Sequence, residues 1–134
     1  MLRNILAVVA GLVAVFVTVG ILEYIGHLLF PVRSDGAAIP PAVQVLVLAA
    51  YFLAALIGGW LAASIAGRSW AAWVIAIVVV AGAISSMFMV PHPQWMQISV
   101  VLAPLFGGLV AAHLTRRPHP ATANADGRGS DADL

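Results

Sequence analysis

The stretch from Asn4 to Phe30 reads NILAVVAGLVAVFVTVGILEYIGHLLF, and it decides the fold class of this chain. Its side chains are apolar or weakly polar, apart from the carboxylate of Glu23 and the imidazole of His27. A helix of about 20 apolar residues crosses the roughly 30 Å hydrocarbon core of a bilayer. The stretch is longer than the roughly 7–15-residue apolar region of a signal peptide, and no clear small-x-small cleavage site ends it. We therefore expect a retained membrane-spanning helix.

Three further apolar runs follow, and proline or glycine marks the turn before each of them. The expected spans are about 4–30, 42–66, 70–90 and 94–114. Because lipid offers no partner to backbone polar groups, each span is expected to be a helix. The sequence thus predicts an all-α integral membrane four-helix bundle with up-down topology over residues 1–115. The polar tail over 116–134 is expected to be disordered and cytoplasmic.

Composition supports this class and excludes others. Of the 134 residues, 63% are hydrophobic and 8% are charged, whereas water-soluble domains carry about 25% charged residues. The net charge of +1 provides no basic stripe for phosphate contacts, so no nucleic-acid partner is expected. The sequence has no cysteine, Ser–His–Asp set, phosphate-binding loop or paired carboxylates. We therefore expect neither an enzyme nor a cofactor.

The arginine positions predict an orientation. In a four-span topology Arg3, Arg68, Arg116 and Arg117 fall on one side, and the loop residue Arg33 falls on the other. An excess of basic residues favours the cytoplasmic side. We therefore expect a multi-pass protein of the inner (plasma) membrane, with both termini in the cytoplasm and the end of the first span in the outer half.

Small residues recur at every fourth position in the second and fourth runs. Such rows let helix backbones approach closely, which drives helix association in lipid. The expected helix-packing residues are Ala54, Gly58, Gly59, Ala62, Gly107, Gly108 and Ala111. We favour packing within one bundle, although two rows on the second run could also serve a homo-oligomer or a larger membrane complex. Because the small residues lie toward the cytoplasmic side, the bundle is expected to be pinched there and wider outside, with Glu23 facing the gap.

The second and fourth runs also resemble each other. LIGGWLAASIAGR at 56–68 aligns with LFGGLVAAHLTRR at 105–117. This similarity suggests two helical hairpins in parallel orientation, a layout known among transporters. Chance similarity in a sequence rich in Gly, Ala and Leu is the alternative.

Glu23 is the one charged residue inside any of the four runs, and His27 follows it at i+4 on the same helix face. An ionisable group at membrane depth is expensive and marks a functional-site candidate. The candidate polar site comprises Glu23, His27, His92, Ser85 and Ser86. The serines could complete the hydrogen bonding of the carboxyl group.

Four interpretations of this polar set remain open. Glu23 and His27 could be a satisfied pair that fixes helix register, or Glu23 could exchange a proton for a substrate. With His92, they could form an outer-side metal site, since two histidines and a carboxylate suit zinc or iron. They could also contact another membrane protein.

Two families resemble parts of this sequence. EYIGHLLFP at 23–31, Gly58-Gly59 and PHPQW at 91–95 resemble small uncharacterised four-span bacterial membrane proteins, a likeness that implies topology alone. EYIG at 23–26 is similar to the first span of small multidrug resistance transporters. That likeness implies that Glu23 is the shared proton and substrate site of a dimer. His27 and the late position of Glu23 depart from the pattern.

Together these observations predict a non-catalytic structural or accessory membrane subunit. A proton-coupled small-molecule transporter that uses Glu23 is the first alternative. An outer-side metal-binding membrane protein is the second.

Overall fold

The computed structural model describes residues 1–30, 40–88 and 94–116, and these form four α-helices. The helices are α1 (Leu2–Leu29), α2 (Pro41–Ala66), α3 (Trp70–Met87) and α4 (Gln94–Leu114). No strand occurs in these three ranges. The predicted all-α four-helix bundle is therefore confirmed. The expected tail and the loop around His92 lie outside the described residues.

Proline and glycine set several helix boundaries. Pro41 opens α2 at its first turn, where a missing N–H costs nothing. Gly67 ends α2 with a φ of 70°, and its N–H donates to the carbonyl of Ala63. This left-handed conformation suits glycine, because glycine has no Cβ to clash. α1 ends at Leu29, shortly before Pro31 in the sequence. This is expected, because proline lacks the backbone N–H that would continue the helix.

Three of the described helices, α1, α2 and α4, are long and apolar enough to cross a membrane. α3 has 18 residues and ends at Met87, whereas the sequence predicted a span to about Val90. At 1.5 Å per residue its length is about 27 Å, slightly less than the roughly 30 Å hydrocarbon core. α3 is therefore a shorter apolar helix than expected.

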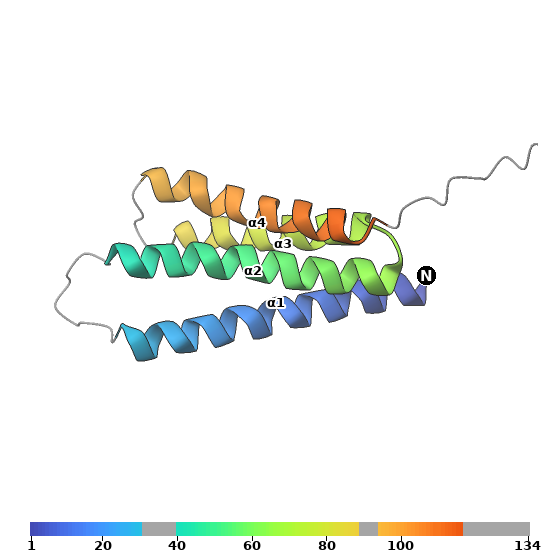
Figure 1. Cartoon of the computed structure of the whole chain (residues 1–134), viewed down its shortest axis with the longest axis horizontal. Coiled ribbons are helices and arrows are strands. Elements are labelled where there is room, and N and C mark those ends of the chain that lie inside the picture. Colours follow the sequence, from blue (N-terminus) through green and yellow to red (C-terminus); the bar gives the residue numbers. More distant parts are fainter. Residues whose placement is uncertain (31–39, 89–93, 117–134) are drawn as a thin grey trace, which may run out of the picture.

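The helices alternate in direction, so that the start of α1 is at the same end of the bundle as the ends of α2 and α4 (Figure 1). α2 is central and packs against all three other helices. α1 packs on α2 and touches α3, but within the described residues it has no contact with α4. The bundle is therefore not a closed ring, and α1 lies at its margin. We call the end with the start of α1 the Arg3 end, and the opposite end the Glu23 end.

Close backbone contacts hold α2 to its neighbours, and they involve glycine. A Cβ built on Gly58 would lie 2.8 Å from the carbonyl oxygen of Gly11 in α1. A Cβ on Gly107 of α4 would lie 2.5 Å from the carbonyl oxygen of Phe52, and one on Gly59 would lie 3.2 Å from the Cβ of Ala111. One row of small residues on α2 thus faces α1 and the other faces α4. A single chain uses both rows.

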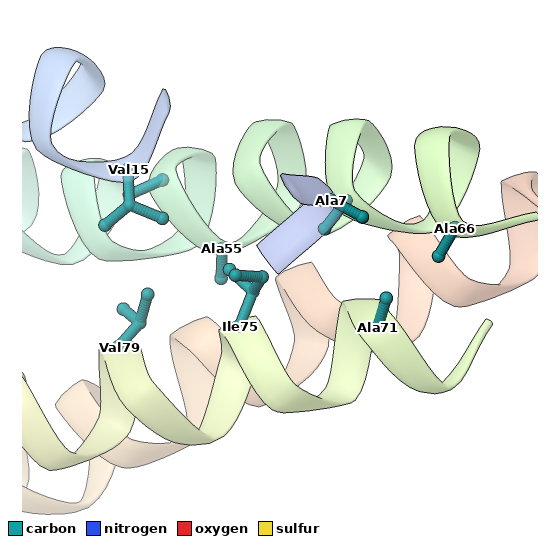
Figure 2. Close-up of a cluster of buried hydrophobic side chains, with 9 residues drawn as sticks. Ala7, Val15, Ala55, Ala66, Ala71, Ile75 and Val79 are labelled. Atoms are coloured by element: carbon teal, nitrogen blue, oxygen red, sulfur yellow. The ribbon is translucent and has the colours of Figure 1, made fainter. Parts of the chain in front are cut away.

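All of the expected packing residues are buried, and larger side chains fill the space that remains. Ile75 of α3 is completely buried. The side chains of Val15, Ala55 and Ile75 come from three different helices and point toward one another (Figure 2). In this cluster small residues of α2 pack against Val15 of α1 and against Ile75 and Val79 of α3.

α1 and α2 are closest in the half of the bundle toward the Arg3 end, where a Cβ built on Gly11 would lie 2.8 Å from the carbonyl oxygen of Gly58. α1 diverges from α2 toward the Glu23 end (Figure 1). The last close approach of α1 places Gly26 against Leu46, at 3.1 Å from its built Cβ to the Cδ2 atom.

The aligned glycines of the proposed repeat make different contacts. Gly58 packs on α1, its own hairpin partner, whereas the aligned Gly107 packs on α2 of the other hairpin. Gly59 and the aligned Gly108 both lie near Ala72 of α3, but the nearest atom to Gly59 belongs to Ala111 and the nearest to Gly108 belongs to Ala76. Equivalent packing therefore does not accompany the sequence similarity between α2 and α4.

We predict that Gly107→Ala destabilises the bundle by about 1–3 kcal/mol, the usual cost of overpacking a tight contact. The new Cβ would press on the Phe52 carbonyl oxygen, which belongs to helical backbone and cannot rotate away. The matched control is Gly82→Ala, where the Cβ meets open space. Unfolding by a denaturing detergent in mixed micelles, followed by tryptophan fluorescence, measures the free energy of unfolding of both variants. Equal stabilities of the two variants would contradict the packing described here.

Candidate functional site

Glu23 and His27 both lie on α1 near the Glu23 end, and both side chains are exposed. Gly26, which lies between them in the sequence, faces Leu46 of α2. At 3.6 residues per turn, Glu23 and His27 lie about 60° and 100° around the helix from Gly26, so both lie on one side of the contact between α1 and α2 and are not enclosed by it. They are one helical turn apart, about 6 Å along the axis.

Within the described residues, the structure gives the side chains of Glu23 and His27 no hydrogen bond and no ion pair with each other or with any neighbour. The serines expected to complete the site bond elsewhere. Ser85 donates to the carbonyl of Ala81 at 2.9 Å, in its own helix. Ser86 donates to the carbonyl of Ala83 at 2.7 Å. Glu23 and His27 are thus neighbours on one helix without a bond between them, and the serines do not bond to either of them.

Ser86 instead takes part in a hydrogen bond between helices. Its hydroxyl oxygen lies 3.2 Å from the hydroxyl of Tyr51 in α2. Tyr51 is half-buried and packs against two of the apolar clusters. Sequence reasoning missed this residue. The available signal was a phenol inside an apolar run, because a buried tyrosine hydroxyl usually finds a partner.

The metal interpretation depends on a residue that the structure does not describe. His92 lies in the range 89–93, between α3 and α4. Among residues 1–30, 40–88 and 94–116, no group of three histidine, aspartate or glutamate side chains is close enough to hold a metal ion. The metal site stays a prediction.

A second polar feature lies at the Arg3 end. The Nη2 group of Arg3 donates to the carbonyl oxygen of Ala66 at 2.9 Å, so the start of α1 caps the end of α2. A cation at a helix C-terminus interacts favourably with the helix dipole. Arg68 and Arg116 are exposed at the same end. This cap was not predicted from the sequence.

A cavity of about 220 Å³ lies beside this cap, between the ends of α2 and α4. Its lining comprises Trp60, Ala63, Ser64, Gly67, Leu114, Thr115 and Arg116. It contains one cationic group, two hydroxyl groups and an indole ring. None of these residues was among the predicted site residues.

Comparisons of the chain with protein-family models, with curated proteins and with solved structures found no match. The resemblances to four-span bacterial membrane proteins and to small multidrug resistance transporters therefore stay predictions.

We predict that the Tyr51–Ser86 hydrogen bond contributes about 0.6 kcal/mol, the average for such bonds between membrane helices. A double-mutant cycle with Tyr51→Phe and Ser86→Ala isolates this coupling from the effect of either change alone. In the matched control cycle Ser85→Ala replaces Ser86→Ala, since Ser85 bonds only within α3. Unfolding free energies in micelles measure both cycles. Equal coupling in the two cycles would contradict the assignment.

Proposed function

We propose that the chain is a non-catalytic structural or accessory subunit of the inner (plasma) membrane, and that it associates with a second copy of itself through α1. The membrane location is supported by three long apolar helices and by large apolar side chains that are exposed along all of the helices. Contiguous apolar surface of this kind suits lipid or a protein partner and not water.

Cytoplasmic placement of the Arg3 end accounts for the charge distribution. Arg3, Arg68 and Arg116 gather there, and within the described residues no acidic side chain accompanies them. Basic residues next to membrane spans are retained on the cytoplasmic side. Both termini would then be cytoplasmic, and Glu23 would lie in the outer half of the membrane.

Exposure of Glu23 is the observation that carries the proposal. It lies seven residues before Phe30, about 10 Å along the helix axis, and so within the hydrocarbon depth. Inserting a charged side chain costs about 2.5–3.5 kcal/mol at the membrane centre, and the cost is smaller nearer the surface, where Glu23 would lie. A partner that hydrogen-bonds the carboxyl group would remove this cost. No described residue of the same chain supplies one.

The free side of α1 has the residue spacing of a helix pair. Among the many exposed positions of α1, one series runs at intervals of three and four residues, the spacing of a left-handed two-helix contact. We call this set the α1 stripe; it comprises Val13, Phe16, Gly20, Glu23, His27 and Phe30. Gly20 has open space around it, so a second helix can approach there.

A second copy suits this stripe because the stripe is self-complementary. Glu23 accepts hydrogen bonds, and the imidazole of His27 donates one. Around a two-fold axis along the membrane normal, two parallel α1 helices would place each Glu23 near the partner's His27. A two-fold interface uses the same patch on both subunits, so one chain supplies both halves of each pair.

We predict that Glu23→Ala or His27→Ala weakens self-association by about tenfold, because each change removes two interhelical hydrogen bonds of the dimer. The exchange variant Glu23→His with His27→Glu keeps the donor and the acceptor and should restore association. The matched control is Ile77→Ala, at an exposed apolar position on α3. Energy transfer between labelled copies in vesicles, at several protein-to-lipid ratios, measures the dissociation constant.

A wild-type chain that stays monomeric at every ratio would overturn the proposal. So would a dissociation constant that Glu23→Ala leaves unchanged. Association that Glu23→Ala weakens but the exchange variant does not restore would argue against the reciprocal pair.

Proton-coupled transport is the second candidate, and exposure of Glu23 supports it too. An unpaired carboxyl group on a membrane helix could release a proton and accept a cation in exchange. The metal-binding alternative depends on His92 and has no support among the described residues.

The transport alternative predicts that a gradient of tetraphenylphosphonium, a lipophilic cation, drives proton flux through the wild-type protein in liposomes. Glu23→Gln should abolish this flux, because an amide cannot release a proton, while circular dichroism stays unchanged. An internal pH-sensitive dye measures the flux. Wild-type vesicles that show no flux above protein-free vesicles would remove this candidate.

A further inference from the structure

The geometry points to a phospholipid site: we propose that the cavity between the ends of α2 and α4 binds the phosphate group of an anionic phospholipid. This inference rests on membrane placement of the bundle and does not depend on the Glu23 pair. The cavity volume of about 220 Å³ exceeds that of several water molecules, at about 30 Å³ each. A phosphate with part of its glycerol headgroup fits such a space.

Charge at the cavity favours an anion. Arg116 lines it, and within the described residues the guanidinium of Arg116 has no acidic partner and no hydrogen bond. Glu23, the one acidic residue in the described part of the chain, lies at the opposite end of α1. Arginine binds phosphate through two parallel N–H groups, which favours a planar, two-point contact.

Helix ends place negative carbonyl groups near this cavity, and several of those groups accept hydrogen bonds. The carbonyl of Ala63 accepts from the N–H of Gly67 at 2.9 Å, and the carbonyl of Ala66 accepts from Arg3. In α4 the carbonyl of Ala111 accepts from both the N–H and the hydroxyl of Thr115. The dipole of α2, which would otherwise repel an anion, is thus offset by the Arg3 guanidinium.

A hydroxyl donor is available beside Arg116. Ser64 lines the cavity, is exposed, and has no side-chain hydrogen bond to another described residue. Its O–H can donate to a phosphate oxygen. Thr115 differs, because its hydroxyl already donates to the end of α4.

The apolar lining favours a lipid over a free phosphate ion. Trp60 and Leu114 belong to the cavity wall and are also exposed on the outer surface of the bundle, by 48% and 64%. Trp60 lies seven residues before Gly67, about 10 Å along the helix axis, so its ring would contact the acyl chain and not the headgroup. Basic pockets between membrane helices on the cytoplasmic side recognise anionic headgroups, and an acyl chain could continue along the exposed apolar wall.

Native mass spectrometry of the detergent-solubilised full chain, titrated with phosphatidylglycerol or phosphatidylcholine, tests the proposal. We expect phosphatidylglycerol to bind at least about fivefold more tightly than phosphatidylcholine, and Arg116→Gln to weaken it by about tenfold. The matched control is Arg68→Gln, because Arg68 is exposed at the same end but does not line the cavity. Glu23→Ala should leave lipid binding unchanged, which separates this result from that of self-association.

Several outcomes would overturn the lipid site. Equal binding of the two lipids would do so, as would equal losses in Arg116→Gln and Arg68→Gln, because general surface charge then accounts for the attraction. Competition with soluble glycerol 3-phosphate distinguishes a lipid site from a site for a soluble phosphate. If it displaces phosphatidylglycerol at the same concentration, the cavity binds a soluble phosphate and not a lipid. Circular dichroism of each variant establishes that it is folded.

Discussion

The close approach of the α2 backbone to two other helices is the constraint on which the bundle depends. Gly58 meets the Gly11 carbonyl of α1, while Gly107 of α4 meets the Phe52 carbonyl of α2. Helix association in lipid lacks the hydrophobic driving force that acts in water, so dispersion contacts and backbone proximity must supply the attraction. Two seams on neighbouring rows of α2 thus organise the described helices, and the third seam, between α3 and α4, closes a compact three-helix group.

Much of this architecture could be predicted from the sequence, because the physical signals are local. Apolar runs of membrane length give the helices, and proline or glycine at Pro41 and Gly67 gives their boundaries. The small-residue rows were also readable, since a spacing of four places them on one face. Which row meets which helix was not readable, because that depends on the arrangement of all four helices.

Sequence alone could not place the polar groups, for the same reason. A closed bundle would enclose Glu23 beside Ser85 and Ser86, but α1 lies at the margin, and so Glu23 is exposed. The hydroxyl groups of Ser85 and Ser86 donate hydrogen bonds to carbonyls of their own helix, and Ser86 also shares a hydrogen bond with Tyr51. Glu23 and His27 share a face because they are four residues apart, and this spacing can be read from the sequence. What surrounds them depends on the arrangement of all four helices, which the sequence does not show.

Using both rows of small residues leaves α2 with a single free side. Ile57, Trp60 and Ser64 lie there, three and four residues apart, and all are exposed. Glycine and alanine have no rotamers to lose on burial, so the two seams form without side-chain entropy cost. For the same reason the two seams do not tolerate larger residues, since any larger side chain separates the helix backbones. Polar and aromatic side chains along the second half of this helix are therefore confined to one narrow strip, the strip that faces away from the rest of the bundle.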